Sequence, residues 1–427
     1  LFRSTMIVLL LMGFPMMIPL LAGALIGFLA LFGGFGQLDT MVQQILAGIR
    51  PASLIAGPRF IFAADIMTRG QSANRLIDLV MAFVGHLRGG LAHVNILSSM
   101  LFAGLSGSAV ADTSALGSML IPAMEKQGYT RRFSAAITAA SSVIGPIIPP
   151  SGIMIIYAYV MGESVAALFL AGIVPGVLVG LSLMLMVKVM ADRYDFPVAS
   201  AKTTWREKGQ ASLKAFFPLM TPVIIMGGIL GGIFTPTEAA AVAAAYGLLI
   251  GLFVMRTLTL RDIPGILQRA SATSAVVLLL VGAAMAFKTV VSLSHAPEIL
   301  AGIILGLSDN PLVLLFLINL LLFVVGMFLD AGPAIIILGP VLGPIFTQMG
   351  VDPIHFAIIM SVNLTVGLIT PPMGLVLFVA SSVSGERIST ISRAILPFLA
   401  VEVIVIFLIT YIPAISMTIP RLTGFAD

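Results

Sequence analysis

Two stretches of the chain decide its fold: Gly145-Pro146-Ile147-Ile148-Pro149-Pro150-Ser151-Gly152 and Gly367-Leu368-Ile369-Thr370-Pro371-Pro372-Met373-Gly374. They lie 222 residues apart. The same offset relates further glycines and prolines: Gly104 to Gly326, Gly117 to Gly339, Pro122 to Pro344, Gly128 to Gly350 and Pro175 to Pro397. One register shared by all these pairs favours an internal duplication over chance. The sequence therefore predicts two homologous halves.

The composition is that of a chain embedded in lipid. Of 427 residues, 59% are hydrophobic and only 9% are charged, whereas soluble domains carry about 25% charged residues. Apolar runs of membrane-spanning length recur along the chain, and the first, Met6–Phe32, is too long for the core of a signal peptide. There is no cysteine, which excludes thiol catalysis and disulfides. The basic residues are scattered in loops and form no patch that indicates nucleic acid.

Lysine and arginine residues indicate how the halves are oriented. Residues 69–132 contain Arg69, Arg75, Arg88, Lys126, Arg131 and Arg132, whereas the matching residues 291–354 contain neither type. Since these residues favour cytoplasmic loops, the first set predicts a cytoplasmic face and its image an external one. The asymmetry then reverses, because the turn near Glu163 is not basic while its counterpart contains Arg387 and Arg393. We predict inverted halves joined by a cytoplasmic linker at residues 192–214.

Two pairs of short apolar runs predict re-entrant hairpins. Residues 91–105 would form a helix of about 22 Å, which falls short of a hydrocarbon core of roughly 30 Å. Ser106-Gly107-Ser108 separates this run from a second one at residues 109–124, and runs at 312–326 and 334–349 flank a tip near Asp330. Each hairpin precedes a helix that prolines interrupt. The predicted fold is an all-α polytopic membrane protein of two inverted-topology repeats, each with a re-entrant hairpin and a broken helix.

Broken helices at membrane depth indicate a transport pathway. Non-helical backbone is tolerated there only inside protein or beside a hydrated cavity. Freed carbonyls and hydroxyls suit a small cation, and half-helix N-termini suit an anion, so we predict a cation-coupled carrier of a carboxylate. Purely structural proline kinks are one alternative, and a channel is another. Protease and ATPase motifs such as H-E-x-x-H, G-x-S-x-G and G-x-x-x-x-G-K-[ST] are absent, so we do not expect an enzyme.

Polar residues at the tips and breaks are the candidate ligands. Two carboxylates, Asp112 and Asp330, are either ligands or caps of half-helices, because a charge at this depth needs a partner or a hydrated site. Hydroxyl and amide groups surround them: Ser106, Ser108, Thr113, Ser114, Ser141 and Ser142 in the first half, and Asn363, Thr365 and Thr370 in the second.

Other charged residues lie in the weaker apolar segments. We assign Arg59, Asp65 and Lys288 to packing or interfaces, with an ion pair between Asp65 and Lys288 as one option. The histidines have no metal-ligand spacing, and His86 falls on a predicted amphipathic helix at residues 74–88.

Several motifs resemble the large membrane subunit of TRAP (tripartite ATP-independent periplasmic) transporters. They are Phe102-Ala103-Gly104-Leu105-Ser106-Gly107-Ser108-Ala109-Val110-Ala111-Asp112, Ile137-Thr138-Ala139-Ala140-Ser141-Ser142-Val143-Ile144-Gly145-Pro146, Pro236-Thr237-Glu238-Ala239-Ala240, Gly326-Met327-Phe328-Leu329-Asp330 and Leu368-Ile369-Thr370-Pro371-Pro372-Met373-Gly374. The resemblance covers nearly the whole chain. It implies sodium-gradient-driven import of a small organic acid, a C4-dicarboxylate or sialic acid, by an elevator mechanism.

The resemblance also implies partners and a location. They are a periplasmic binding protein that delivers the substrate, a small four-span membrane subunit, and the bacterial inner membrane, with the N-terminus cytoplasmic and the C-terminus periplasmic. A stand-alone sodium-coupled dicarboxylate carrier or ion exchanger is the alternative, followed by a cation channel. The chain departs from the family pattern at Arg50-Pro51-Ala52-Ser53, at Pro58-Arg59 and at Lys288, which bears on the scaffold.

From the resemblance we expect a division into moving and static parts. Scaffold spans and an interfacial helix occupy residues 1–90, the transport domain residues 91–162 and 312–384, further scaffold with the linker residues 163–311, and a C-terminal scaffold helix residues 385–427. Expected sodium ligands are Ser106, Gly145, Ile148 and Pro150 in one half, and Gly326, Asp330, Gly367, Thr370 and Pro372 in the other. Expected substrate contacts are Ser108, Asp112, Thr113, Ser141 and Asn363.

Overall fold

The computed structural model describes residues 17–32, 34, 38–50, 55–70, 72–194, 196, 203–294 and 310–426, together with residues 5, 8, 9, 12, 14, 302 and 306. This part of the chain is nearly all helical and contains no strand. The helices of its first half are α2 (Met17–Phe32), α3 (Leu38–Ile49), α4 (Ala56–Arg69), α5 (Ser72–Val84), α6 (Gly90–Ser106), α7 (Ala109–Lys126), α8 (Arg131–Ser142), α9 (Gly152–Met161) and α10 (Val165–Tyr194). Those that follow are α11 (Trp205–Leu230), α12 (Pro236–Leu249) with a π-helical turn (Ile250–Val254), α13 (Ile263–Leu293), α15 (Pro311–Phe328), α16 (Ala331–Gln348), α17 (Pro353–Gly367), α18 (Leu375–Ser384), α19 (Ile388–Tyr411) and α20 (Ala414–Leu422).

Among the described residues, seven helices are long and apolar enough to cross a membrane: α10, α11, α12 with its π-helical turn, α13, α15, α16 and α19. The prediction of an all-α polytopic membrane protein is confirmed. Two of the seven, α15 and α16, are the arms that we predict to be re-entrant. With 18 residues each, they reach about 27 Å, so their re-entrant nature stays a prediction. The expected span Met6–Phe32 and the linker lie partly outside the described residues.

Local sequence explains where the helices begin and end. Thr235 and Glu238 form a capping box at the start of α12, with Pro236 in the first turn, so the Pro236-Thr237-Glu238 motif is a helix start. Thr204 and Glu207 begin α11 in the same way. The two Gly/Pro-rich stretches end α8 and α17, and the chain resumes as α9 and α18. Each break contains a cis bond between its paired prolines, Pro149–Pro150 and Pro371–Pro372.

Helix boundaries in the two halves follow the offset seen in the sequence. For example, α7 begins at Ala109 and α16 at Ala331, while α8 begins at Arg131 and α17 at Pro353. The starts of α6, α9 and α10 correspond to those of α15, α18 and α19 within one residue of the same offset. The opposite orientation of the halves stays a prediction.

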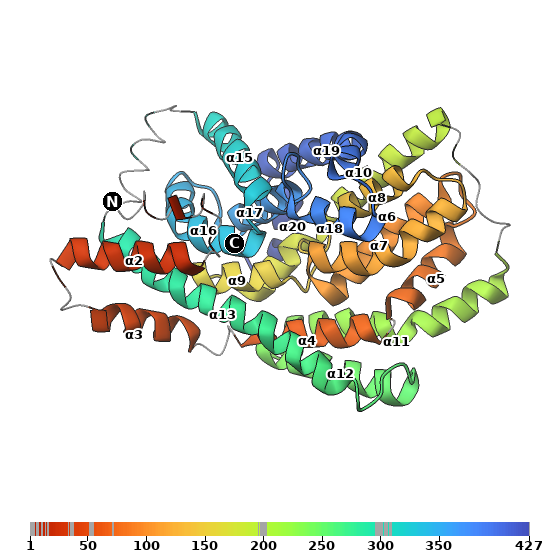
Figure 1. Ribbon diagram of the computed structural model, residues 1–427, viewed down its shortest axis with the longest axis horizontal. Helices are drawn as coiled ribbons and strands as arrows, with labels where there is room; N and C mark the ends of the chain where they lie inside the picture. The colour runs from red at the N-terminus through yellow and green to blue at the C-terminus, as the bar shows by residue number, and fades with distance from the viewer. Residues whose placement is uncertain are drawn as a thin grey trace.

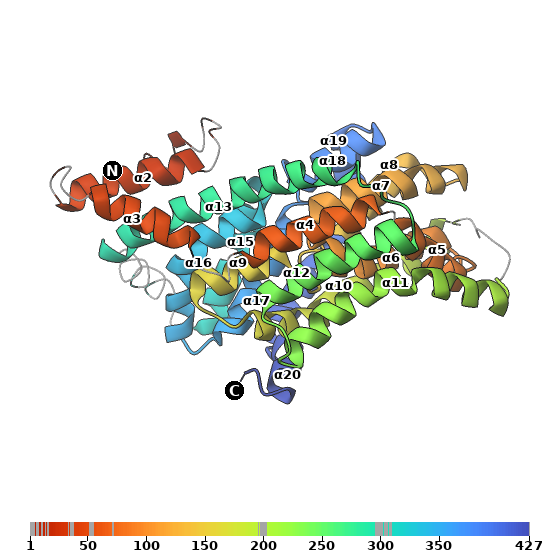
Figure 2. The same ribbon diagram turned by 90° about the horizontal axis from the view of Figure 1, so that it is seen from below.

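The helices form two layers. Layer 1 contains α2 to α5 and α11 to α13, which occupy the lower half of Figure 1 and lie toward the viewer in Figure 2. Layer 2 contains α6 to α10 and α15 to α20, in which each hairpin packs against a broken helix. In layer 2, α10 packs on α6, α17 and α20, and α19 packs on α8, α17 and α18. We expected α10 and α19 in the scaffold, but their neighbours are the hairpins and broken helices.

Buried polar side chains join hairpin arms to broken helices in both halves. Between α6 and α8, the Asn95 amide donates to the Thr138 hydroxyl at 2.7 Å. Between α15 and α17, the Asn363 amide donates to the Asn319 oxygen at 2.7 Å. Such bonds satisfy polar groups that would otherwise be desolvated, and they fix the register of the paired helices.

The charged residues in the weaker apolar segments bind partners on neighbouring helices, but Asp65 and Lys288 do not bind each other. Asp65 on α4 pairs with Arg269 on α13 at 2.9 Å and not with Lys288. The Lys288 ammonium donates to the Val160 carbonyl at the end of α9 at 2.9 Å, and Arg59 donates to the Thr237 carbonyl at 3.1 Å. The amphipathic helix α5 ends at Val84, so His86 lies just beyond it. These contacts agree with packing and interface roles, and the ion pair between Asp65 and Lys288 is wrong because each finds a nearer partner.

Candidate functional site

A cavity of about 230 Å³ lies between the two hairpin tips and layer 1. Tip 1 contributes Ser106 and Ser108, tip 2 contributes Asp330, and the first break contributes Pro146 and Pro150. The wall in layer 1 is formed by α4 and α13. Its residues are Gly57, Pro58, Phe60, Ile61, Thr273, Val277 and Leu280. The two tips, distant in sequence, therefore line one cavity.

Tip 1 is a tight turn that gathers oxygen atoms. The backbone of Gly107 is left-handed, with φ of 61°, which lets α6 end and α7 begin within two residues. The Ser108 hydroxyl caps α7 by accepting from the Ala111 amide at 3.4 Å. Asp112 is therefore not the cap. Its Oδ1 accepts from the Ser106 hydroxyl, and its Oδ2 has no partner among the described residues although the side chain is fully buried.

The first break packs directly on tip 1. A side chain at Gly107 would place its Cβ 2.8 Å from the Pro150 carbonyl oxygen, and one at Gly145 would overlap Asp112 Oδ2. The missing side chains let the backbone of the break approach the tip and the carboxylate. The Pro146 carbonyl already accepts from the Ser151 hydroxyl. Ile148 is half-buried and its side chain packs at Gly176, so only its backbone is available for a ligand role.

In the second half, two glycines make a backbone contact between the hairpin and the broken helix. A Cβ added to Gly367 would lie 2.5 Å from the Gly326 Cα, and one added to Gly326 would lie 2.7 Å from the Leu364 carbonyl oxygen. The Thr370 hydroxyl donates to the Val366 carbonyl at 2.9 Å, which leaves its lone pairs free. Pro372 is exposed and does not line the cavity.

Asp330 stands at the first position of tip 2, where a cap is expected. It makes no side-chain capping bond to α16, and the residue is exposed at the cavity. Since this carboxylate lines the cavity, a ligand there could reach it, and whether it is a ligand or a cap stays a prediction.

The predicted substrate contacts divide into two groups. Ser108 lines the cavity. The others are buried and bonded within layer 2: Thr113 donates to Ser142 at 2.7 Å, Ser141 bonds with Ser99 at 2.8 Å, and Asn363 bonds with Asn319. Asp112 is buried behind Ser106. The structure thus brings Ser106, Ser108, Pro150 and Asp330 to one cavity and places Thr113, Ser141 and Asn363 in helix packing.

The atoms around Asp112 fit a small cation. The unpartnered Oδ2 is a carboxylate oxygen beside the Ser106 hydroxyl of tip 1, and the Pro150 carbonyl of the first break lies against Gly107 of that tip. Hard cations are bound by such carboxylate, hydroxyl and carbonyl oxygens. A buried carboxylate oxygen without a partner is otherwise costly, so a cation here would supply the missing interaction.

Sequence reasoning missed the wall in layer 1. Thr273, Val277 and Leu280 are spaced by four and three residues and so occupy one face of α13. That spacing was readable in the sequence, but apolar residues facing a cavity look the same as residues facing lipid.

Comparison with known proteins relates residues 4–415 to a family model described as "Tripartite ATP-independent periplasmic transporter, DctM component". An ectoine/5-hydroxyectoine TRAP transporter large permease of Ruegeria pomeroyi is 44% identical, over 97% of this chain and 96% of that one. A sialic acid TRAP large permease of Vibrio cholerae is 40% identical, over 96% and 95%. A C4-dicarboxylate TRAP large permease of Pseudomonas aeruginosa is 41% identical, over 88% and 87%.

The fold also resembles a solved membrane transporter. The YdaH transporter of Alcanivorax borkumensis has a TM-score of 0.61 over 87% of both chains, at 17% identity. At this identity the likeness concerns the fold alone.

Proposed function

The chain belongs to the DctM component family of tripartite ATP-independent periplasmic transporters, and from this premise we propose that it imports a small carboxylate-bearing solute driven by a sodium gradient. The observation that carries the proposal is the cavity between the two tips. One carboxylate, Asp330, faces it, and a second, Asp112, has an unpartnered oxygen behind Ser106. Two ionised carboxylates would repel a carboxylate substrate in this cavity. We therefore expect cations to bind together with the substrate.

The positive charge that balances the substrate's carboxylate would come from helix N-termini and bound sodium, not from basic side chains. None of the cavity's lining residues is Lys or Arg. The N-terminus of α7 begins at tip 1 and that of α16 at tip 2, and helix N-termini favour anions. Bound sodium adds the remaining charge. In this arrangement substrate binding depends on sodium, which is the thermodynamic requirement for coupling.

The relatives suggest the range of substrates. Their names include ectoines, sialic acid and C4-dicarboxylates, all of which carry a carboxylate. We propose that the substrate of this chain is in the same class. The small and mostly apolar cavity favours a compact solute.

We propose an elevator motion in which layer 2 moves against layer 1. The cavity lies at the boundary between the layers, so displacement of layer 2 would carry both tips and the bound solute together. Because α10 and α19 pack within layer 2, we place them in the moving part. Partners in the proposal are a periplasmic binding protein and a small membrane subunit, as the tripartite family description suggests, in the bacterial inner membrane.

The test is uptake in proteoliposomes that contain this chain with its small subunit and cognate binding protein. Labelled ectoine, sialic acid and succinate are offered with and without an inward sodium gradient. We expect uptake of one class that needs both sodium and the binding protein. Uptake without the binding protein would favour a stand-alone exchanger, and uptake indifferent to sodium would remove the coupling proposal.

A further inference from the structure

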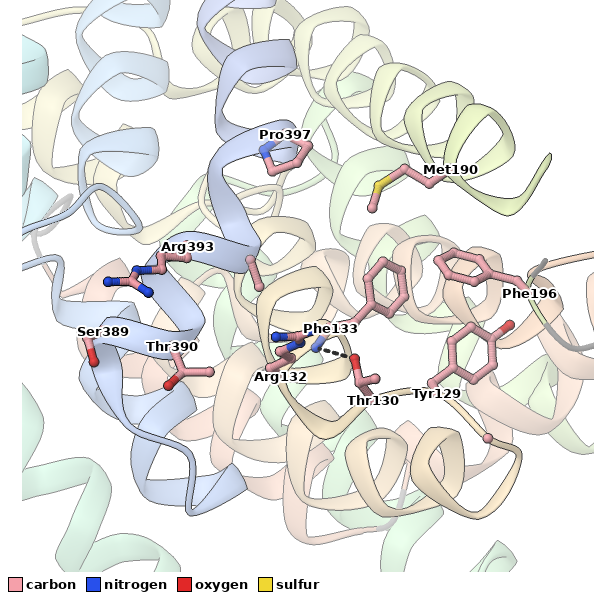
Figure 3. A pocket seen from close by; sticks show the side chains of 12 residues that line it. Tyr129, Thr130, Arg132, Phe133, Met190, Phe196, Ser389, Thr390, Arg393 and Pro397 are labelled. Atoms are coloured by element: carbon pink, nitrogen blue, oxygen red, sulfur yellow. Dashed lines mark hydrogen bonds between the residues drawn. The ribbon is translucent and has the colours of Figure 1, made fainter. Parts of the chain in front are cut away.

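A second cavity, of about 760 Å³, lies away from the hairpin tips. Figure 3 shows it between the turn that joins α7 to α8, the first turns of α19, and the end of α10 with Phe196. These segments are far apart in the sequence. They share one property, which is that each lies in a stretch that its Lys and Arg content predicts to be cytoplasmic.

One side of this cavity is basic and rich in hydrogen-bond donors. It contains Arg132 on α8 and Arg393 on α19, together with the hydroxyls of Ser389 and Thr390 (Figure 3). Within the described part of the chain, neither arginine makes an ion pair or a hydrogen bond, whereas the adjacent Arg131 pairs with Glu125 at 3.7 Å. Two unpaired guanidinium groups at one cavity create a site for an anion, above all for phosphate oxygens.

Backbone groups add to the basic side. Helix α19 begins after Arg387, whose side chain makes no capping bond. The first N–H groups of a helix have no intrahelical acceptor. Ser389 and Thr390, which line the cavity, belong to this first turn, and a helix N-terminus favours an anion.

The other side of the cavity is aromatic and apolar. Phe133 and Phe196 are packed with their ring centroids 4.8 Å apart, and Tyr129 contacts both rings at 5.8 and 5.3 Å. Met190 and Pro397 complete this side (Figure 3). A free, fully hydrated anion gains nothing from such a wall, whereas an amphiphile with an anionic head and an apolar body is complementary to both sides.

We propose that this cavity binds an anionic phospholipid of the cytoplasmic leaflet. The phosphate lies between Arg132 and Arg393, and the glycerol and first acyl carbons lie along Phe133 and Met190. The site is at helix ends, which is the depth of lipid headgroups. The bound lipid would tie α8 of the first broken helix to α19. This proposal does not depend on the transported solute.

The test measures lipid retained by the full chain. The chain is purified in a mild detergent, depleted of lipid, incubated with phosphatidylglycerol or phosphatidylcholine, and analysed for bound lipid by mass spectrometry. The variant Arg132→Gln/Arg393→Gln removes the basic side. The matched control Arg131→Gln/Arg387→Gln removes two arginines from the same helix starts, neither of which lines the cavity. Ser389→Glu is a second variant that places an anion at the exposed basic side.

We expect phosphatidylglycerol to be retained and phosphatidylcholine not. Each basic side chain near an anionic lipid raises the affinity for that lipid roughly five-fold, so the cavity variant should bind phosphatidylglycerol about 25-fold less tightly. Ser389→Glu should also lose the lipid. The control should keep it. Equal loss in the cavity variant and the control would overturn the proposal, because it would show a general surface charge. Displacement of the lipid by millimolar glycerol phosphate or inorganic phosphate would also overturn it, because the site would then take a free phosphate.

Discussion

Replacement of Gly367 by alanine should disturb the second half of the site through backbone packing. The added Cβ would lie 2.5 Å from the Gly326 Cα, whereas carbon atoms in contact lie at about 3.5 to 4.0 Å. Because the obstacle is backbone, no rotamer change relieves it, and α15 and α17 must separate by about 1 Å. Overpacking of this kind costs about 1 to 3 kcal/mol. The same separation would stretch the 2.7 Å bond between Asn363 and Asn319, for a further loss of about 1 kcal/mol.

The assay compares Gly367→Ala with Gly227→Ala. Gly227 is an exposed glycine in α11, and an added Cβ would meet no atom within 4 Å beyond the backbone of its own helix, so its replacement should be neutral or stabilise by up to about 1 kcal/mol. Thermal unfolding in detergent should show a midpoint lower by several degrees for Gly367→Ala alone. Sodium activation of uptake should also shift to higher concentration, since the expected ligands lie at this contact. Equal midpoints and equal sodium dependence in the two variants would refute the reasoning.

Three further predictions concern single side chains. Asp112→Asn keeps the bond from Ser106 but replaces an anionic oxygen, so sodium-dependent uptake should fall about ten-fold or more with normal insertion; an unchanged sodium half-activation would argue against a ligand role. Asp330→Ala and Thr370→Ala should weaken sodium dependence, while Thr347→Ala, which removes a similar bond to the Gly343 carbonyl, should not; three identical sodium titrations would exclude both residues from the site. Burial, and then the charge of Asp352, raise the pKa of Glu163 above its ordinary value of 4.5. The protonated side chain therefore stabilises the folded state below pH 4.5, and this contribution is lost as the pH rises through the raised pKa. Glu163→Gln should therefore raise stability at pH 7 by about 0.5 kcal/mol, since the group is partly exposed, with little effect at pH 4; thermal midpoints at both pH values provide the check.

Glycine and proline made the breaks and tips predictable, because these residues act on their own backbone. The paired prolines interrupt a helix at each break, although single prolines are accommodated inside α7, α10 and α19, and glycine at position 107 permits a left-handed turn that other residues rarely adopt. The sequence therefore located both hairpins and both broken helices. The presence of Asp330 at a tip was equally readable, since a helix start follows it directly.

The direction of a polar side chain on a helix was not predictable in the same way. Ser141 and Asn363 occupy equivalent positions in the repeat, and both turn toward the first arm of their own hairpin. Whether such a residue faces a ligand or a neighbouring helix depends on the rotation of the helix about its axis, which packing decides. For the same reason the sequence did not show that Asp65 pairs with Arg269 rather than with Lys288. Both arginine and lysine lie on α13, and packing decides which of them faces α4.

The contacts of Lys288 and Tyr159 suggest what the proposed motion must overcome. Both hold the end of α9, in layer 2, to layer 1: the ammonium donates to the Val160 carbonyl at 2.9 Å, and the Tyr159 hydroxyl donates to the Gly48 carbonyl at 2.8 Å. The proposed displacement of layer 2 would break both bonds, and a neutral and a charged bond together contribute about 2 to 4 kcal/mol. Sodium and substrate can drive the displacement only through their different affinities for the two positions of layer 2. A difference of this size corresponds to roughly 30- to 1,000-fold in affinity. If layer 2 moves as proposed, the Lys288 contact would therefore help to set how strongly the motion depends on the bound ligands.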